Sequence, residues 1–325
     1  MIIDVRNTIK YGKTPVTKRM KKCGTLKVDF VESTPIVWND RLIRFEWVRN
    51  DQWSSQGLVK REHGYYHFVD METEEEVGAP FGLDHSFGAC YAEDGKMYVI
   101  GGRGRGGGNI LDLFWSEDLI NWQEKEVLRF DEDVKTYNTS ICKAEDNEYA
   151  LAIEIGGPSP LVGRPFTIIF AKSTNIMDWE LLDPTVHVFS RERYTACPSI
   201  RYFDGFYYMV YLEGLPELRW APYIVRTKDF KVFEIGLINP FMMFDDDDKI
   251  IIHPERFTDE EIERVLNAVD CNNSDVDFCE YKGKTVILYS WGNQHGVEFL
   301  AMAEYDGTLK EFLTSFFPEQ NIQNA

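Results

Sequence analysis

Hydrophobic and polar residues recur along the chain as strand–turn–strand units. Five segments have two mostly apolar runs around a short polar turn, and they span residues 33–48, 86–102, 139–155, 197–213 and 274–291. Their turn residues are Asp40, Gly95, Asn147, Gly205 and Gly283, all types that tolerate a left-handed backbone conformation. Successive turns are separated by 55, 52, 58 and 78 residues. The pattern therefore predicts a repeated β-hairpin.

A second motif follows most of these hairpins. Four polar residues each stand six positions before an aromatic residue, in the pairs Ser116–Trp122, Ser173–Trp179, Thr227–Phe233 and Asp306–Phe312. A hydrophobic residue lies midway in each pair: Leu119, Ile176, Phe230 and Leu309. This spacing predicts a strand end, a tight polar turn and a further strand that opens on an anchoring aromatic residue.

Two hairpins per repeat make a four-stranded sheet. Segments such as 207–212 (YYMVYL) are apolar on both faces, whereas an antiparallel sheet with one wet face would alternate. Radially stacked sheets are covered on both faces. We therefore predict an all-β fold, a single-domain five-bladed β-propeller over residues 1–325. The expected blades are approximately 25–80, 81–132, 133–188, 189–240 and 270–315.

The longest interval between turns contains a helical pattern at 257–269. Thr258 and Glu261 have the spacing of a capping box, and Ile262, Val265, Leu266 and Val269 form an apolar stripe. We expect one short helix inserted between blades four and five.

Composition and charge argue against several classes of binding partner. The 325 residues are 44% hydrophobic and 14% aromatic, which excludes a disordered chain. The formal net charge of −19 opposes binding to phosphate backbones and anionic membranes, so we expect neither nucleic acid nor a membrane as a partner. A neutral carbohydrate is not disfavoured. The N-terminus lacks the apolar region of a signal peptide. We expect a cytoplasmic protein as given, or a periplasmic or secreted one if a leader was removed, and the oligomeric state is left open.

Three further patterns do not indicate a cofactor site. The six cysteines have no CxxC spacing, so we expect no disulfide framework and no zinc site, with Cys90, Cys142, Cys197 and Cys279 as buried thiols. The loop 101–108 (GGRGRGGG) precedes a strand, whereas phosphate-binding loops precede a helix. The run 245–248 (DDDD) is expected to be a solvated loop, with a hard-cation site as the alternative.

Polar residues gather where one mouth of the central channel should lie. The first two strands of each blade are antiparallel, so the start of the first and the end of the second lie on the same face. The starts carry Glu32, Thr34, Asp84, His85, Asn138, Tyr194, Thr195, Asn273 and Asp275; the ends carry Arg49, Arg103, Glu154, Glu213 and Trp291, with His295 just beyond. Convergent carboxylates, cations and aromatic side chains in a concave mouth predict a ligand site.

The repeats resemble a known group of enzymes. Residues 115–122 (WSEDLINW) and 197–213 (CPSIRYFDGFYYMVYLE) are similar to the five-bladed propellers of glycoside hydrolase family 43 and its relatives, including families 32 and 117. The resemblance covers roughly residues 25–312. It implies glycoside hydrolysis, usually inverting, with an Asp base, a second Asp that tunes pKa and orientation, and a Glu acid. Family 117 propellers are thought to use a His as acid, which makes His295 a candidate.

The sequence departs from the family-43 pattern at the expected catalytic positions. The Asp-Pro pair of the base is Thr34-Pro35 here, with Glu32 two residues earlier, and the Glu-Gly-Pro or Glu-Ala-Pro triplet of the acid is Ala196-Cys197-Pro198. The middle Asp usually lies about nine residues before the turn glycine, whereas Asp84 lies eleven before Gly95. Either the catalytic groups are relocated, or the protein is a non-catalytic carbohydrate-binding propeller. A WD-type interaction propeller is disfavoured by the repeat length.

We predict a glycosidase of family-43 type that cleaves a neutral or plant- or algal-type oligosaccharide by acid/base catalysis, without metal or organic cofactor. The assignment is Asp84 as base, Glu213 as acid and Asp275 as the group that holds geometry and pKa. Glu154 and His295 are reserves for the acid, and Glu32 is the reserve for the base. The expected substrate-binding residues are His85, Arg103, Asn138, Tyr194, Thr195, Trp220 and Trp291. Structural alternatives remain: a turn cap for Asp84, an Asx-turn for Asp275, an ion pair between Glu32 and Arg49, and blade packing for the two tryptophans.

Overall fold

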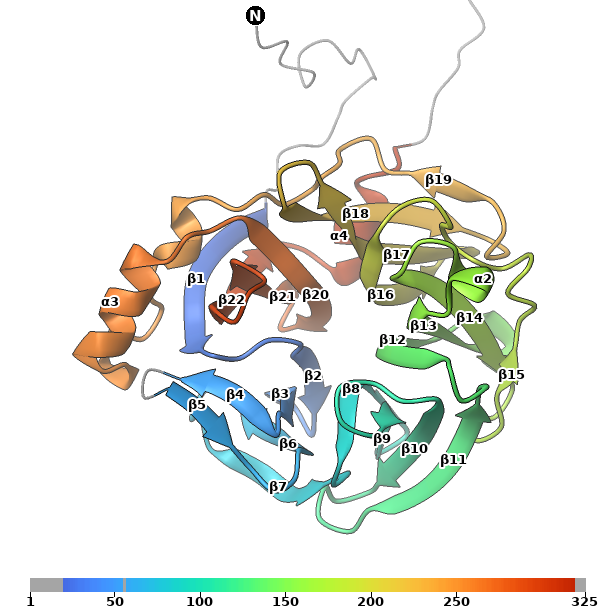
Figure 1. Cartoon of the computed structure of the whole chain (residues 1–325), viewed down its shortest axis with the longest axis horizontal. Helices are drawn as coiled ribbons and strands as arrows, with labels where there is room; N and C mark the ends of the chain where they lie inside the picture. Colours follow the sequence, from blue (N-terminus) through green and yellow to red (C-terminus); the bar gives the residue numbers. More distant parts are fainter. Residues whose placement is uncertain (1–19, 55–56, 319–325) are drawn as a thin grey trace, which may run out of the picture.

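Four-stranded antiparallel sheets stand side by side around a common centre (Figure 1). The structure is a computed structural model and describes residues 20–54 and 57–318. Sheet I contains β2 (Thr34–Trp38), β3 (Arg41–Val48), β6 (Tyr65–Asp70) and β7 (Glu76–Phe81). Sheet II contains β8 (His85–Glu93), β9 (Lys96–Arg103), β10 (Ile110–Ser116) and β11 (Gln123–Arg129). A small hairpin of β4 (Asp51–Ser54) and β5 (Gly57–Lys60) follows β3.

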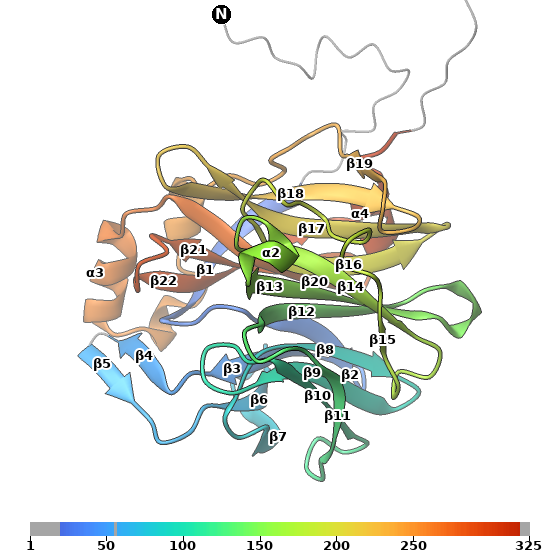
Figure 2. The same cartoon turned by 45° about the vertical axis from the view of Figure 1, so that its right-hand side comes forward.

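The remaining sheets continue this order around the ring (Figure 2). Sheet III contains β12 (Lys135–Lys143), β13 (Tyr149–Gly157), β14 (Thr167–Ser173) and β15 (Glu180–Leu181). Sheet IV contains β16 (Thr195–Phe203), β17 (Phe206–Leu215), β18 (Arg219–Thr227) and β19 (Phe233–Ile235). Sheet V contains β20 (Asn272–Tyr281), β21 (Lys284–Gly292), β22 (Glu298–Tyr305) and the N-terminal strand β1 (Met20–Val28). The first strands of the sheets, β2, β8, β12, β16 and β20, contact one another around the centre.

The hairpin turns explain why the repeat was visible in the sequence. Four of them have two consecutive residues with positive φ, as type I′ turns require: Asn39–Asp40, Asp94–Gly95, Asp204–Gly205 and Lys282–Gly283. In sheet III a short 3₁₀ helix, η1 (Glu145–Asn147), takes the place of this turn. The segments predicted as hairpins correspond to β2–β3, β8–β9, β12–β13, β16–β17 and β20–β21.

The second strand of each sheet is buried on both faces, as radial stacking requires. In β13, Leu151 and Ile153 pack in the cluster that contains Ile100 of sheet II, whereas Ala150 and Ala152 pack in the cluster that contains Tyr211 and other residues of sheet IV. Successive side chains of one strand thus face two different neighbouring sheets. Sheets IV and V also share one parallel backbone bridge, between Trp220 and Asn272.

The ring closes with a strand from the N-terminal end of the described chain. β1 pairs antiparallel with β22, with Met20 opposite Tyr305 and Val28 opposite Phe299. Residues 25–28 therefore belong to sheet V, whereas the sequence prediction placed the chain from residue 25 in the first blade. Only strand pairing distinguishes the two arrangements, because β1 carries no turn motif.

The structure also differs from the prediction at the last repeat. Residues Leu309–Thr314 form helix α4, not the strand expected around Phe312. Thr308 and Glu311 form a capping box, and Leu309, Phe312 and Leu313 are its buried residues. The spacing of these three apolar residues indicates a helix, but the repeat pattern led to the prediction of a strand.

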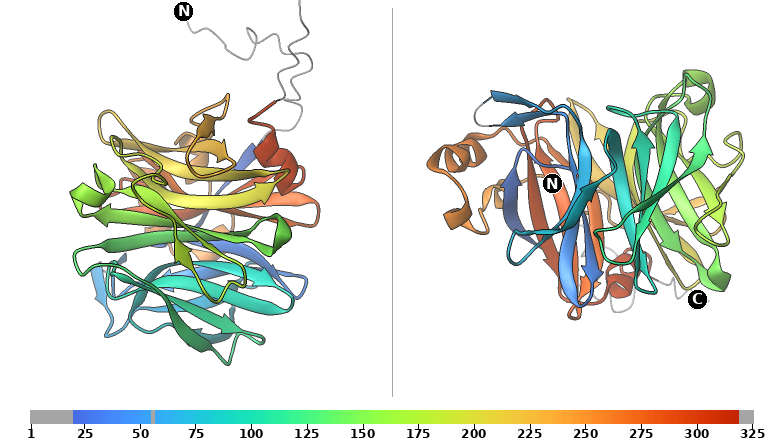
Figure 3. Two further views of the ribbon diagram at one scale, coloured as in Figure 1. Left: turned by 90° about the vertical axis from the view of Figure 1, so that its right-hand side faces the viewer. Right: turned by 90° about the horizontal axis from the view of Figure 1, so that it is seen from below.

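Helix α3 (Asp259–Asn267) stands on the outside of the ring and begins at the capping box of Thr258 and Glu261 (Figure 3). The prediction named one helix, whereas the described residues also contain α4, the short α2 (Ser159–Val162), and the 3₁₀ helices η2 (Asp246–Lys249) and η3 (Pro254–Arg256). None of the described helices is long and apolar enough to cross a membrane.

The cysteines of the described residues are all free. Cys90 and Cys142 are buried, but Cys197 and Cys279 are only half-buried, which corrects the expectation that all four are buried.

A buried lysine joins β1 to the loop before sheet V. Lys22 Nζ donates to Asp248 Oδ2 at 2.7 Å and to Asn273 Oδ1 at 3.0 Å. Asp248 is fully buried and also accepts from the Tyr289 hydroxyl at 2.7 Å. The four-aspartate run was expected to be a solvated loop, but its last member lies in the interior because this cation and hydroxyl satisfy it.

Replacing Lys22 by Met should destabilise the protein by about 3 kcal/mol or more, because the charge of Asp248 would be left buried without its partner. Equilibrium urea unfolding followed by tryptophan fluorescence measures the change. The matched control is Lys21→Met, because Lys21 is exposed and should change stability by less than about 0.5 kcal/mol. Equal effects of the two substitutions would contradict the role of Lys22.

Candidate functional site

Four of the five inner strands carry a β-bulge near their start, and several side chains of the site come from these bulges. The register shifts between Ser86 and Gly88 in β8, Thr136 and Thr139 in β12, Ala196 and Ser199 in β16, and Ser274 and Asp277 in β20. A bulge inserts an extra residue and re-aims its side chain. Three residues within these bulges have positive φ: Phe87 (49°), Cys197 (49°) and Asp275 (50°).

Glu32 has the same conformation in front of β2, with φ of 59°. It lies eight residues before the second turn residue of its hairpin, as Phe87, Cys197 and Asp275 do in theirs. The repeat therefore places Glu32, Phe87, Cys197 and Asp275 at equivalent points of the ring.

Four carboxyl groups and one guanidinium interact at this mouth. Arg49 Nη2 lies 3.3 Å from Glu32 Oε2, and its Nη1 lies 3.7 Å from Glu298 Oε2. The negative charges of Asp275, Glu298 and Glu154 all oppose ionisation of Glu32. These side chains come from sheets I, III and V, so only the closed ring brings them together.

Burial raises the pKa of Glu32 to about 8, although Arg49 favours its ionised form. The two effects act in opposite directions, and desolvation is the larger because the group lies inside the mouth and its other charged neighbours are negative. Glu32 therefore binds a proton near neutral pH when no ligand is present.

Glu154 has a different environment, made of neutral donors. Its Oε2 accepts the backbone N–H of Cys197 at 2.8 Å and the side-chain amide of Asn138 at 3.1 Å. Burial raises its pKa to about 7, and these two hydrogen bonds counteract the shift. The backbone of Asn138 contributes a further hydrogen bond that lowers the pKa, so the hydrogen-bond donors to this carboxyl are neutral groups.

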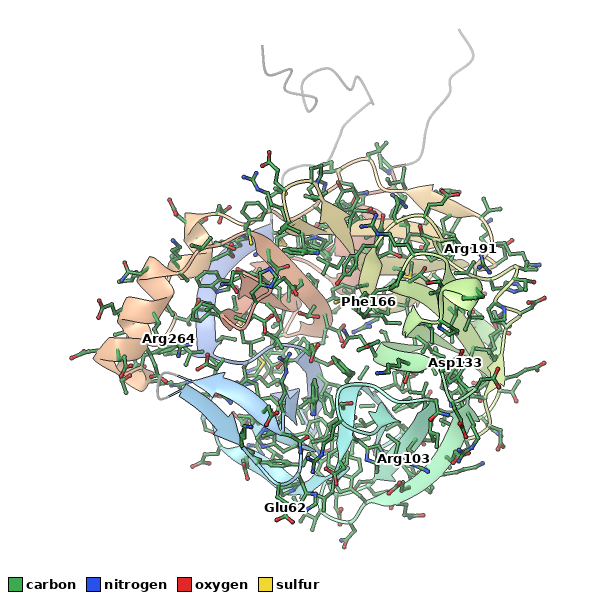
Figure 4. The ribbon with its side chains drawn as sticks, viewed as in Figure 1. Glu62, Arg103, Asp133, Phe166, Arg191 and Arg264 are labelled. Atoms are coloured by element: carbon green, nitrogen blue, oxygen red, sulfur yellow. The ribbon has the colours of Figure 1, made fainter. Side chains whose placement is uncertain are left out.

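An arc of aromatic rings lines the other part of the mouth. Successive ring centroids are 4.5 Å apart for Trp47–Phe87, 5.1 Å for Phe87–Tyr137, 5.1 Å for Tyr137–Phe166 and 5.5 Å for Phe166–Tyr194. Figure 4 shows Phe166 beside the centre of the ring. The hydroxyl of Tyr194 is kept neutral by burial and by the negative charges of Glu154, Asp275 and Glu32, which raise its pKa. The aromatic arc therefore ends at Tyr194, close to the carboxyl groups.

Of the residues predicted from the sequence, the structure brings together Glu32, Glu154, Asp275, Asn138 and Tyr194. Asp84 lies apart from them. Its Oδ2 bonds to His63 Nδ1 at 2.8 Å, and its Oδ1 is 3.4 Å from Arg105 Nε. The hydrogen bond from His63 is the main reason that its pKa is lowered.

Glu213 also lies apart from the other carboxyls. Arg193 Nη1 is 3.1 Å from its Oε2, and burial raises its pKa while Arg193 and Tyr211 lower it. The register explains the difference from Glu154. Glu154 stands opposite the bulge of β12, whereas Tyr211 occupies that place in sheet IV and Glu213 follows two residues later.

His85 and Arg103 both contact Asp112, a residue of their own sheet II. His85 Nε2 is 2.8 Å from Asp112 Oδ2, and Arg103 donates to both oxygens of Asp112 at 2.7 and 2.6 Å. His85, Asp112 and Glu124 also form a cluster whose ligand atoms lie within 4.8 Å of one another. The guanidinium of Arg103 already neutralises Asp112, so these residues do not fit a cation.

The remaining predicted residues differ in accessibility. Trp291 is fully buried, donates to Thr25 Oγ1 at 2.9 Å and stacks on Phe299, so it has no face free for a sugar. Thr195 is also fully buried. Trp220 is half-buried and its ring lies 6.4 Å from that of the exposed His295, at the rim near Glu298.

Sequence reasoning missed Glu298 and Cys197 as members of the mouth. Glu298 opens β22, a third strand that the inner-hairpin argument did not consider. Cys197 was interpreted as a core thiol, although its distance of eight residues before the turn is the one it shares with Glu32 and Asp275. Counting eight residues back from the turn in each repeat would have identified Cys197 as a residue of the mouth.

Ionisation of Glu32 should couple to stability. The pKa of Glu32 is raised in the folded state, so the folded protein binds more protons than the unfolded chain between about pH 4.5 and pH 8. The free energy of unfolding should therefore fall as pH rises through this window. Glu32→Gln should weaken that fall by about 1 kcal/mol or more, measured by urea unfolding at pH 5 and pH 8. Glu62→Gln, at an exposed position, should leave it unchanged; a Glu32→Gln profile that matches the parent would contradict the shift.

Comparison with known proteins supports the architecture. No protein-family model and no curated protein matches the sequence. Among solved structures, a complex of BT0996 with RGII matches with a TM-score of 0.57 and 12% identity, covering 88% of this protein and 92% of the other. CoXyl43, a GH43 β-xylosidase/α-arabinofuranosidase from a compost microbial metagenome in complex with xylotriose, matches with a TM-score of 0.52 and 10% identity over 88% and 93% of the two proteins.

The GH43 protein BlXynB from Bacillus licheniformis matches with a TM-score of 0.57 and 11% identity. The match covers 88% of this protein and 54% of BlXynB, so the present chain spans about half the length of that protein. At such identities the likeness concerns the fold. The chain thus has a β-propeller fold like that of the family-43 glycoside hydrolases.

Proposed function

We propose that the protein is a five-bladed β-propeller glycoside hydrolase that acts on a neutral oligosaccharide at the mouth of its central channel. The single observation that carries the proposal is the meeting of Glu32, Glu154 and Asp275 from three different sheets beside one cation, Arg49. Glycosidic cleavage needs one group that protonates the leaving oxygen and one carboxylate that activates water or attacks carbon. Two of these carboxyls have raised pKa values, which is the condition for an acid that stays protonated near neutral pH.

Glu154 is the proposed general acid. Its hydrogen-bond donors, the Cys197 N–H and the side chain and backbone of Asn138, are neutral. No cation is among the main influences on its pKa, so burial raises the pKa to about 7 and leaves a large protonated fraction near neutral pH. The proton of neutral Glu154 is then available to the leaving oxygen of a bound substrate.

Glu32 is the proposed base. Arg49 favours its ionised form, but burial raises its pKa to about 8, so Glu32 acts as a base in the fraction of molecules in which it has lost its proton, and that fraction grows as pH rises. Asp275 completes the group: it accepts from Ser274 Oγ at 2.7 Å, and its charge acts on Glu32, Glu154 and Glu298. Asp275 thus tunes the other carboxyls. The aromatic arc of Trp47, Phe87, Tyr137, Phe166 and Tyr194 supplies apolar surface for a sugar ring.

Glu154→Gln should lower the turnover of an oligosaccharide by about 10²-fold or more, because a nearly isosteric amide cannot donate the proton. An aryl glycoside with a strongly acidic leaving group should be much less affected, since its oxygen needs no proton. Glu32→Gln should slow both substrates, because the water or carbon step is common to them. Initial rates with xylo- and arabino-oligosaccharides and with their dinitrophenyl glycosides measure these effects.

Glu213→Gln is the matched control, since Glu213 is a buried glutamate at the end of the equivalent strand in sheet IV. It should retain near-parental turnover. If Glu213→Gln loses activity while Glu154→Gln keeps it, Glu213 is the acid and the assignment of Glu154 is wrong.

A non-catalytic carbohydrate-binding protein is the second candidate. The observation that favours it is Ala196, which stands where the resemblance to family 43 would place the Glu of the acid triplet and which is fully buried. Isothermal titration calorimetry with xylotriose and related sugars, beside a hydrolysis assay of the same panel, distinguishes the two functions. Binding without any cleavage would replace the enzyme by the binding protein.

A further inference from the structure

Cys197 lies between the carboxyl groups of Glu154 and Asp275, and both its backbone N–H and its thiol are placed to interact with them. It is a bulge residue of β16 with φ of 49°, a conformation that a non-glycine residue adopts at a cost in strain. This backbone geometry turns both its N–H and its side chain toward the mouth. Strain of this kind persists where surrounding contacts hold it.

The contacts of Cys197 extend to sheets III and V. Its backbone N–H donates to Glu154 Oε2 at 2.8 Å, and the side-chain amide of Asn138 donates to its Sγ at 3.6 Å. The carboxyl of Asp275 lies close enough to the thiol to act on it through its charge and as a hydrogen-bond acceptor. One residue of sheet IV therefore contacts a carboxyl on each side, and neither carboxyl belongs to its own sheet.

The surrounding charges keep the thiol in its neutral, donating form. The groups that face it are the carboxyls of Asp275, Glu154 and Glu32 and the neutral amide of Asn138. Burial, and then the negative charges of Asp275 and Glu154, raise the pKa of the thiol well above its ordinary value. A thiol that stays protonated is a poor nucleophile, so its chemistry in the mouth is that of a hydrogen-bond donor.

We propose that Cys197 is a positioning residue of the site, which fixes the carboxyls of Glu154 and Asp275 relative to each other through its backbone N–H and its thiol. The catalytic consequence rests on the function proposed above, whereas the link between the three groups does not. Removing the thiol frees Asp275 from sheet IV while the N–H bond to Glu154 remains. Cys197 thus acts through the two carboxyls and not on the substrate.

The first test measures the link without any substrate. The rate of alkylation of Cys197 by iodoacetamide is followed against pH, with quantification of the labelled peptide by mass spectrometry. Asp275→Asn should move the alkylation profile to lower pH and speed labelling at pH 8 by about tenfold, because it removes the nearest opposing charge. Asp277→Asn is the matched control: Asp277 lies in the same strand but bonds to Ser199 and Arg201, so it should leave the profile unchanged.

A profile of Cys197 that is the same in the parent, Asp275→Asn and Asp277→Asn would overturn the proposal. Thermal melting of each variant confirms that it is folded during labelling. Because labelling needs no turnover, a shifted profile in a protein that cleaves no glycoside would uphold the link while refuting the hydrolase.

The second test measures the consequence for turnover. Cys197→Ala should lower kcat by about 10-fold to 100-fold, with a smaller change in KM, and should shift the limbs of the pH–rate profile. Cys197→Ser, which restores a donor, should recover part of both effects. Cys142→Ala removes a buried thiol of the neighbouring inner strand and should leave the pH–rate profile unchanged. Parental kcat and an unshifted profile in Cys197→Ala would overturn the positioning role.

Discussion

Four carboxyl groups share one guanidinium in the mouth of this ring, and that shortage of positive charge governs the chemistry of the site. Arg49 contacts Glu32 and Glu298, while Glu154 and Asp275 are held by neutral donors. In a partly dry environment such a group cannot be fully ionised, because each added charge is opposed both by desolvation and by its neighbours. Protons are therefore retained near neutral pH, and the raised pKa values of Glu32 and Glu154 are the consequence.

The arrangement depends on closure of the ring. Glu32 precedes β2, Glu154 lies in β13 and Asp275 lies near the start of β20, so their approach requires sheets I, III and V to be fixed around one axis. The pairing of β1 with β22 and the buried bond of Lys22 to Asp248 supply part of that constraint. The site therefore also depends on the contacts that β1 makes with β22 and with Asn273 of β20.

Local backbone geometry also constrains where the side chains of the site lie. A residue with positive φ stands at the head of four inner strands, within a bulge in β8, β16 and β20 and just before β2, and the repeat uses that place for a carboxylate, an aromatic ring or a thiol. Glu32 and Asp275 use it for charge, Phe87 for the aromatic arc, and Cys197 for a donor. A fold of similar repeats thus produces an asymmetric mouth, acidic on one part and aromatic on the other.

The sequence by itself determined the hairpins, because type I′ turns and two-sided apolar strands are local patterns that follow directly from residue type. It also determined the cap of α3 and named Glu32, Glu154, Asp275, Asn138 and Tyr194 among the candidates. It did not determine which carboxyls meet: Asp84 and Glu213 satisfy the same local rule of strand start or strand end, yet they pair with His63 and Arg193. That choice depends on the bulges, because the register places Glu154 opposite the bulge of β12 but Tyr211, not Glu213, opposite the bulge of β16. Likewise β1 joins sheet V through hydrogen bonds to a strand far away in the chain, and no local pattern encodes such a partner.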